Sequence, residues 1–396
     1  MRSEPANTSL MTSANIAPRA RRRILIVAGE ASGDLHGADL AKEILARDPD
    51  CELAGIAGSK MREAGVNPLF KAEDIAGLGV AELASTIRLT LGALNSMRRR
   101  LRSEPPDLLV LIDFAEFNMI LAGVAHRAGV PVLYYITPQV WAWRRGRIGK
   151  LMRRADRLAV VFPFEAKLFA GAGERVSFVG HPLLDRVKPE QDRPATLARH
   201  GFRPRTRLLA LMPGSRRGEI RYLLRPMLGA AQVLAADHDL TPVIVLAPTL
   251  TVSDLREAAG SALDGVRIIN EDTYSIVAAS ELALVTSGTA TLETALLGCP
   301  MVIAYKVSPL TYALGRVLIR GVDFIGMPNL LAGRRIVPEL IQWEVTPSKL
   351  VRAGEPMLAE SLHAEVASSL RAVAQTLGTP GAAGRVADIA LAMLPS

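Results

Sequence analysis

The stretch LALVTSGTATLETALLGCPMVIAY, residues 282–305, shows in miniature the pattern that runs through the whole chain. A short apolar run is followed by small and hydroxyl residues, a short apolar helix and a second apolar run. Gly298 and Pro300 supply the stop signals that end the helix. Continuous apolar runs of this length are typical of strands buried on both faces of a parallel sheet. The stretch therefore predicts a strand, a crossing helix and a parallel second strand.

The same alternation occurs in two series along the chain. The apolar runs of the first series are 24–30, 51–58, 107–114, 131–136, 157–164 and 176–182, and those of the second are 208–215, 241–249, 266–271, 282–288 and 301–307. Helical patterns separate these runs, and repeated strand–helix crossover builds a doubly wound sheet. We therefore expect an α/β protein in which two Rossmann-like domains in tandem face each other across a cleft.

Composition outside the two series sets the expected domain boundaries. The first residues are rich in Ser, Thr, Asn, Pro and Arg, which is typical of a disordered segment. A Pro-rich and charged stretch separates the two series and indicates a linker. The expected parts are a disordered leader at 1–23, an N-terminal domain at 24–186, a linker at 187–207, a C-terminal domain at 208–345, and helices at 346–396 that pack back on the N-terminal domain.

Composition also limits the classes of function. The chain has 396 residues and a formal net charge of +8, and no stretch approaches the ~20 uninterrupted apolar residues of a membrane span. The N-terminus has no apolar core, so it does not predict a secretory signal. Cys51 and Cys299 have no metal-site spacing and suit a reducing cytosol. A basic chain of this kind suits contact with nucleic acid or with anionic lipid.

Two strand ends of the second series predict a site for a nucleotide diphosphate. Ser215 can cap the helix that follows PGS, and Arg216 lies beside its N-terminus. Residues 289–291 begin another helix and are expected to present free backbone amides to a phosphate. Glu293 can accept hydrogen bonds from the two hydroxyls of a ribose. Plain helix capping by acids and serines explains each feature alone. The expected donor residues are Gly214, Ser215, Arg216, Ser287, Gly288, Thr289, Ala290, Thr291 and Glu293.

Strand ends of the first series carry candidate residues for the acceptor. In LIDFAEFNM, residues 111–119, a buried Asp113 beside aromatic residues suits a general base, with Glu116 as a second acid, although an Asp or Asn there can simply cap a helix. AGEASGDLHGADL, residues 28–40, equally suits a tight turn. The segment WAWRR has four possible roles. It could line the site with stacked aromatic and arginine side chains, bind nucleic acid, face a membrane, or form a solvent-exposed basic surface. The expected acceptor residues are Glu30, Ser32, Gly33, Asp34, His36, Asn118, Gln139, Trp141, Trp143 and Arg144.

No metal or other cofactor is expected. The acidic triplet at 48–50 resembles a metal-binding Asp-x-Asp, but it precedes a strand and so falls at the wrong end of the sheet. No phosphate-binding G-x-x-x-x-G-K-[ST] sequence occurs either.

Residues 75–102 predict a helix with two apolar faces. The stripe Leu83, Ile87, Leu91, Leu94 and Leu101 has the spacing of a face packed on a core. Further apolar residues and a run of arginines favour a helix that also touches lipid. The expected membrane contacts are Leu89, Met97, Arg98, Arg99, Arg100 and Arg102.

The ordered set of these motifs resembles the lipid-A-disaccharide synthase family, inverting glycosyltransferases of the GT-B fold. The matching segments are GEASGDLHGA, IDFAEFN, YYITPQVWAWRRGR, FPFE, VGHPLLD, PGSRRGEI, SGTATLE and PNLLAGRRIVPELIQ, from about residue 24 to the C-terminus. The resemblance implies that UDP-2,3-diacylglucosamine donates its sugar to 2,3-diacylglucosamine 1-phosphate, giving a β-1,6 disaccharide and UDP. It also implies a peripheral enzyme on the cytoplasmic face of the inner membrane, and a homodimer with exchanged C-terminal segments.

The resemblance assigns three residues by position. The family's essential acid falls on Asp113, its arginine on Arg216 and its asparagine on Asn329, which is therefore also expected to bind the UDP-sugar. The family usually has Pro and Asp where this chain has Ala115 and Glu116, which puts the role of the second acid in doubt. The rival interpretations are a UDP-N-acetylglucosamine epimerase or polyprenyl-acceptor transferase of the same fold, a basic nucleic-acid-binding protein, and a two-lobed solute-binding protein. The motifs and the missing recognition or export signals argue against them, so no nucleic-acid partner is expected.

Overall fold

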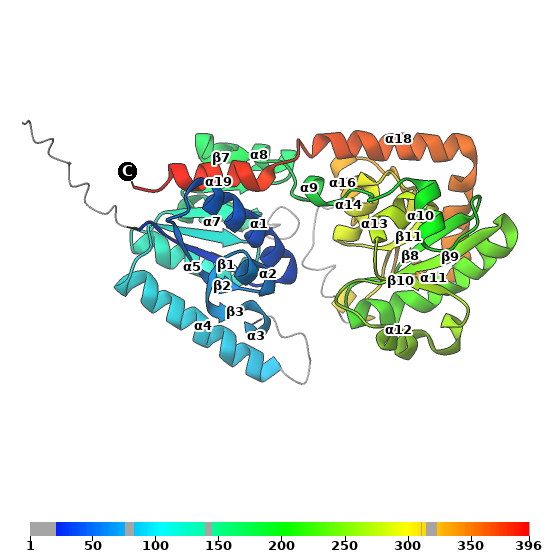
Figure 1. Cartoon of the computed structure of the whole chain (residues 1–396), viewed down its shortest axis with the longest axis horizontal. Coiled ribbons are helices and arrows are strands. Elements are labelled where there is room, and N and C mark those ends of the chain that lie inside the picture. The colour runs from blue at the N-terminus through cyan, green and yellow to red at the C-terminus, as the bar shows by residue number, and fades with distance from the viewer. Residues whose placement is uncertain (1–20, 76–82, 139–144, 310, 314–322, 396) are drawn as a thin grey trace, which may run out of the picture.

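Two parallel sheets covered by helices form two lobes that lie side by side (Figure 1). The structure is a computed structural model of the chain and describes residues 21–75, 83–138, 145–309, 311–313 and 323–395. We call the lobe built on the seven-stranded sheet the N-lobe and the lobe built on the six-stranded sheet the C-lobe. This arrangement confirms the expected α/β fold with two Rossmann-like domains.

The N-lobe sheet has the strand order β3-β2-β1-β4-β5-β6-β7, and all its pairs are parallel. The central strands are buried along their length because helices cover both faces, which explains their unbroken apolar sequences. The strands are β1 (Arg23–Ala28), β2 (Glu52–Ala57), β3 (Asn67–Lys71), β4 (Leu108–Ile112), β5 (Val132–Tyr135), β6 (Arg157–Val160) and β7 (Val176–Phe178).

The C-lobe sheet has the order β10-β9-β8-β11-β12-β13, again with parallel pairs only. Its strands are β8 (Arg207–Met212), β9 (Leu240–Val245), β10 (Arg267–Ile269), β11 (Ser280–Thr286), β12 (Met301–Tyr305) and β13 (Glu339–Ile341). The opening stretch of sequence forms β11, helix α14 and β12, with Val285 paired to Ile303. Sequence analysis missed one edge strand in each sheet, β3 and β13, because neither is an apolar run.

Helices connect the strands and cover both faces of each sheet. In the N-lobe they are α1 (Ala31–Arg47), α2 (Ser59–Glu63), α3 (Ala72–Ile75), α4 (Leu83–Ser103), α5 (Ala115–Arg127), η2 (Arg145–Arg147), α7 (Ile148–Arg154), α8 (Pro163–Leu168), η3 (Ala170–Arg175) and α9 (Leu183–Arg186). The helices that follow are α10 (Arg193–Arg199), α11 (Arg217–His238), α12 (Val252–Ala259), η4 (Gly260–Leu263), α13 (Thr273–Ala278), α14 (Thr289–Leu296), α16 (Met327–Ala332), η5 (Gln342–Glu344), α17 (Pro347–Gly354), η6 (Glu355–Leu358), α18 (Glu360–Thr376) and α19 (Ala382–Ala392).

The C-terminal helices divide between the two lobes, which corrects the expectation that all of residues 346–396 pack on the N-terminal domain. Helix α17 packs on α11, and α18 packs on α14 and α16, so both belong to the C-lobe. Only α19 packs on α1, where Val386 and Ala390 join the apolar cluster of the N-lobe. The chain therefore crosses back to the N-lobe at residues 377–381, between α18 and α19 (Figure 1).

The stretch expected to be a linker contains structure of its own. Helix α10 lies within it and packs on α13 of the C-lobe. The hydroxyl of Ser275 accepts from the amides of Glu190 and Gln191, and the guanidinium of Arg193 donates to the carbonyl oxygens of Ala279 and Thr206. These bonds fasten the stretch to the C-lobe, so the free part of the connection is short.

Helix α4 buries a different face from the one its stripe predicts. Leu94 and Leu101 are buried as expected, but Leu91 is exposed. Met97, expected to touch lipid, is buried in the N-lobe core with 1% exposure, so that assignment is wrong. Leu89 is exposed, in agreement with its assignment to the outer face. The burial of Met97 moves the apolar outer surface of α4 toward its N-terminal half.

Candidate functional site

Each sheet reverses its strand order at one place, and the predicted site residues cluster there. In the N-lobe the reversal separates β1 from β4, and in the C-lobe it separates β8 from β11. The loops leaving such a pair diverge to opposite faces of the sheet, which is where open α/β sheets bind ligands. Glu30 and Asp113 follow β1 and β4, while residues 213–216 and 287–288 follow β8 and β11. The structure therefore places Glu30, Asp113 and residues 213–216 and 287–288 at the switch points of their lobes.

The loop after β8 is shaped by a glutamate that sequence analysis did not single out. One carboxylate oxygen of Glu219 accepts from the amide of Ser215 at 2.8 Å and from that of Arg216 at 3.3 Å. Glu219 therefore caps α11, and the expectation that Ser215 caps it is wrong. Gly214 has φ 130°, and a Cβ there would lie 2.4 Å from the Glu219 carboxylate, so only glycine fits. The position of Glu219 in the sequence, three residues after Arg216, is the signal for this cap.

The guanidinium of Arg216 lies at the surface of this loop. Its side chain is 63% exposed, and its closest acid is Glu219 at 3.5 Å. Tyr305, at the end of β12, is near enough that the charges of both groups act on its pKa, which is raised mainly by burial. A surface cation with one loosely held partner can turn toward an arriving anion without breaking a buried ion pair.

The start of α14 offers an uncrowded approach to backbone amides. Gly288 has φ 154° and ψ −159°, a conformation restricted to glycine, and no atom lies within 4 Å of the place where its Cβ would be. The amides of Thr289 and Ala290 find no acceptor in the described part of the chain. The Thr291 amide does not share this property, because it donates to the carbonyl oxygen of Gly288 at 3.2 Å, which corrects our expectation of three free amides.

Glu293 lies one turn into α14 and is half-buried. Burial raises the pKa of its carboxyl, and no hydrogen bond joins that carboxyl to any residue that the structure describes. Its charge also acts on Tyr274, whose pKa is raised to about 12 mainly by burial and is lowered in part by Arg186 of the N-lobe. An acid buried without a donor is costly for a folded protein. Such a group is a candidate for binding a ligand's hydroxyls.

Asp113 follows β4 in a strained backbone conformation. Its φ is 48° and that of Phe114 is 46°, so two successive non-glycine residues are left-handed. Burial, then the nearby charge of Glu30, raises the pKa of Asp113 to about 6, while a bond from the Phe114 amide opposes the rise. A carboxyl with this pKa is ionised at neutral pH and still basic enough to take a proton.

Glu30, the N-cap of α1, is exposed and lies near Asp113, and Ser32, in the first turn of α1, is also exposed. Gly33 is buried, and a Cβ there would lie 3.4 Å from that of Ala28, an ordinary van der Waals contact. Asp34, expected at the acceptor site, instead accepts from the amides of Gly58, Lys60 and Met61 at 2.7–3.1 Å. These bonds hold α2 against α1 and give Asp34 a structural role.

His36 lies on α1, and His181 lies between β7 and α9. Burial, followed by the charge of Arg186, lowers the pKa of His36 to about 4, and burial lowers that of His181 to about 3. The Nδ1 atom of His36 and the hydroxyl of Tyr135 are buried without a partner in the described structure. Both histidines are therefore neutral at physiological pH.

The two remaining polar residues of IDFAEFN have different surroundings. Asn118 is fully buried, and its Nδ2 atom donates to the carbonyl oxygens of Asp113 at 2.9 Å and Ile112 at 3.1 Å. Glu116 is exposed and forms an ion pair with Arg147 at 2.7 Å. Asn118 therefore acts on the backbone of Asp113, whereas Glu116 joins α5 to the segment before α7.

Asn329 cannot contact a ligand in this structure. It is fully buried, its Nδ2 atom donates to Val337 and Glu339, and its Oδ1 atom accepts from the amides of Ile336 and Val337. All four hydrogen-bonding positions of the amide are thus used, which corrects its assignment to the donor site. Glu339 also accepts from the amides of Ile325 and Gly326.

This network extends to the donor loop. The hydroxyl of Ser287 donates to the carbonyl oxygen of Ile325 at 3.0 Å. Asn329 therefore supports the loop before α14 from behind, through Glu339 and the Ile325 peptide. Gln139, Trp141, Trp143 and Arg144 lie outside the described residues. Among the residues described, no group of three or more His, Cys, Asp and Glu could hold a metal ion.

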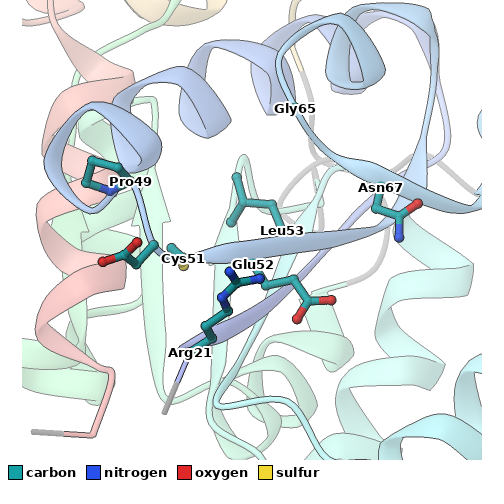
Figure 2. Close-up of a pocket in the computed structure, with 8 residues that line it drawn as sticks. Arg21, Pro49, Cys51, Glu52, Leu53, Gly65 and Asn67 are labelled. Atoms are coloured by element: carbon teal, nitrogen blue, oxygen red, sulfur yellow. The ribbon is translucent and has the colours of Figure 1, made fainter. Parts of the chain in front are cut away.

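A hollow of about 310 Å³ lies at the opposite end of the N-lobe sheet (Figure 2). Pro49, Cys51, Glu52 and Asn67 line it together with Arg21, at the start of β2 and β3. The acidic triplet at 48–50 thus precedes β2, at the end of the sheet away from the switch point, as its position in the sequence indicates. The hollow is separate from the candidate site.

Comparison with known proteins connects both lobes to one family. The family model for lipid-A-disaccharide synthetase matches residues 24–382. The chain is 48% identical to the lipid-A-disaccharide synthase of Geobacter sulfurreducens over 375 residues, covering 94% of this chain and 97% of that one. It is 44% identical over 380 residues to that of Syntrophus aciditrophicus, with 94% and 97% covered.

Solved structures share the fold at low sequence identity. The calicheamicin glycosyltransferase CalG4 matches with a TM-score of 0.60 and 18% identity, over 94% of this chain and 98% of that chain. MurG of Acinetobacter baumannii matches with a TM-score of 0.57 and 15% identity, over 94% and 99%. At these identities the likeness supports the GT-B fold alone.

We predict that Asn329→Asp destabilises the protein by about 3 kcal/mol, because a carboxylate would then face Glu339 and the Val337 carbonyl in the core. Asn329→Ala should cost about 2 kcal/mol by leaving buried groups without partners. Denaturant unfolding measures both. Asn67→Ala on the exposed edge strand β3 is the matched control and should change stability by less than ~0.5 kcal/mol. Unchanged stability of the Asn329→Asp variant would contradict the network.

Proposed function

Because this chain belongs to the lipid-A-disaccharide synthase family, we propose that it transfers the sugar of UDP-2,3-diacylglucosamine to the 6-hydroxyl of 2,3-diacylglucosamine 1-phosphate. The products are UDP and the β-1,6-linked disaccharide 1-phosphate of lipid A. The proposal depends above all on one observation: a strained acid with a pKa of about 6 follows β4 at the N-lobe switch point. The C-lobe switch point carries the complementary anion-binding groups.

Asp113 is our proposed general base. Inversion at the anomeric carbon is a single displacement, and it requires a group that takes the proton of the attacking 6-hydroxyl as the new glycosidic bond forms. The raised pKa of Asp113 supports this role, because a carboxylate of ordinary pKa is a poor base at neutral pH. Glu30 supports it further, since its negative charge beside Asp113 favours proton uptake.

Arg216 and the two free amides of α14 are our proposed stabilisers of departing UDP. The leaving group gains negative charge as the glycosidic bond to the diphosphate breaks. The exposed guanidinium and the amides of Thr289 and Ala290 are donors of the right kind, and the bare Cα of Gly288 leaves room for a phosphate to approach. Glu293, which lacks a donor in the described structure, is our proposed acceptor for the ribose hydroxyls.

The function has a direct assay. UDP release should require both acylated sugars and should be nearly absent with either one alone. Release with the donor alone would favour an epimerase or hydrolase of the same fold. Undiminished release with EDTA is expected, because cationic side chains and amides supply the charge stabilisation in this proposal. Tight, salt-dependent binding of nucleic acid without UDP release would instead support the non-enzymatic alternative.

Attachment to the inner leaflet of the inner membrane is a further part of the proposal. Within the described residues, no helix is long and apolar enough to cross a membrane. Leu89 and Leu91 are 52% and 53% exposed on α4, and the exposed Arg88, Arg99 and Arg102 lie on the same helix. Adjacent apolar and cationic side chains suit an anionic lipid surface. The homodimer stays a prediction.

Asp113→Asn should abolish sugar transfer while UDP still binds, because the amide cannot accept the proton. In the wild type, kcat/KM should fall as the pH drops below about 6.

The raised pKa of Asp113 also means that the stability contributed by Asp113 is complete below about pH 4 and is lost as the pH rises through 6. The Asp113→Asn variant should therefore melt higher than the wild type at pH 8. An active variant would transfer the base role to Glu116 or another residue.

Arg216→Ala should reduce kcat about a hundredfold, equivalent to ~3 kcal/mol, by removing a charge that assists the leaving group. The neighbouring residue Arg217, which forms an ion pair with Asp254 of α12 at 2.8 Å, provides the control. Arg217→Ala should retain turnover within a fewfold. Equal turnover of the two variants would exclude the assigned role of Arg216.

Leu89→Ser with Leu91→Ser should weaken sedimentation with vesicles of anionic phospholipid at least severalfold, because both leucines are exposed. Val233→Ser with Val252→Ser, two exposed apolar residues of the C-lobe, is the matched control and should leave sedimentation unchanged. Equal binding by both double variants would remove α4 from the proposed membrane surface.

A further inference from the structure

The turn between β4 and α5 has a backbone that its side chains do not favour. Asp113 has φ 48°, and Phe114 has φ 46° and ψ 55°, so both residues are in the left-handed helical region. Aspartate adopts this conformation fairly readily, but a bulky phenylalanine rarely does. A conformation of this kind persists only where surrounding contacts enforce it, and such places are concentrated in functional sites.

Two buried donors hold the peptide of Asp113. Its carbonyl oxygen accepts from the Tyr134 hydroxyl at 2.8 Å and from Asn118 Nδ2 at 2.9 Å. Tyr134 is fully buried, and burial, followed by the charge of Asp113, raises its pKa far above the ordinary value. The tyrosine therefore keeps its proton and donates it at every physiological pH. Neither donor touches the carboxyl group itself.

The ring of Phe114 is held by two different surfaces. It stacks on Phe117, one turn later in α5, with centroids 5.0 Å apart and planes at 20°. It also lies directly on Gly29, where a Cβ would be only 2.3 Å from its Cδ1 atom. Gly29 is not among the glycines with positive φ, so its backbone would tolerate alanine. The glycine is therefore needed to admit the ring, not for its conformational freedom.

We propose that Phe114, seated on Gly29, is a positioning residue that holds Asp113 in the left-handed turn and shields its carboxyl from water. The inference rests on the proposed function of Asp113 as the base. Gly29 directly follows β1, and Phe114 follows β4 across the switch point, so this contact joins the two loops that carry the acids of the N-lobe. Tyr134 and Asn118 add to this hold through their hydrogen bonds to the Asp113 carbonyl oxygen.

A double-mutant cycle between Gly29 and Phe114 tests the contact. Gly29→Ala should push the ring off its seat and lower kcat at least tenfold, with little change in KM for the UDP-sugar. Phe114→Ala should have a similar effect. The double variant should be no worse than Phe114→Ala alone, because the added methyl then enters the space that the ring has left. Losses that multiply in the double variant would overturn the proposed contact.

The pKa of Asp113 gives a readout that core packing alone would not move. Carboxyl ¹³C NMR of Asp-labelled protein, assigned with the Asp113→Asn variant, should show the wild-type pKa near 6. It should show a value closer to 4 in the Gly29→Ala and Phe114→Ala variants. An unchanged value in both would reject the positioning role. If the value moves while Asp113→Asn still turns over, the positioning role stands and the proposed base falls.

Phe114→Gly separates the ring from the backbone. Glycine accepts φ 46° without steric cost, so this variant should unfold at a higher temperature than Phe114→Ala, which loses the same ring contacts but keeps the backbone strain. If Phe114→Gly is folded and its Asp113 pKa is lowered, the ring is responsible. A folded Phe114→Gly variant with wild-type turnover and an unchanged Asp113 pKa would refute the proposal.

Discussion

Parallel strand pairing determines where chemistry can occur in this protein. Every strand of both sheets runs in the same direction as its neighbours, so all carboxyl ends of a sheet lie along one edge. Between β1 and β4, and between β8 and β11, the following helices leave toward opposite faces. The peptide groups at these two places are not covered by a crossing helix. Charged residues and glycines, which would pack poorly under a covering helix, are tolerated at these two places. The acids and glycines of the candidate site lie there.

Hydrogen bonding distinguishes the acids that hold the fold from those that suit chemistry. Asp34 accepts from three backbone amides, and Glu339 accepts from two amides and Asn329. Such bonds fix nearby loops. Burial raises the pKa of Asp113 and of Glu293. The cost of their burial is met by the rest of the fold, which is the usual relation between a binding site and its scaffold.

Sequence was sufficient for the fold and for the strand ends, because buried parallel strands are unbroken apolar runs. It missed β3 and β13, whose edge positions require no such run. It could not tell which face of α4 is buried, since Leu91 and Met97 both fit a helical stripe. Asn329 and Asp34 were expected to contact ligands. Only the tertiary structure shows that the Asn329 amide and the Asp34 carboxylate are already bonded within the protein. The left-handed turn at Phe114 has no sequence signal, because that residue type disfavours it.

The course of the C-terminal segment limits how the two lobes can move. The chain passes between them once before α10 and again between α18 and α19, where the His181 amide donates to the Leu377 carbonyl oxygen. At the second crossing Gly180 and Gly378 are in such close contact that a Cβ on Gly378 would lie 3.1 Å from the Gly180 Cα. The two places where the chain crosses between the lobes define a line. Rotation about the line through the two crossings is the relative motion of the lobes that stretches neither of them.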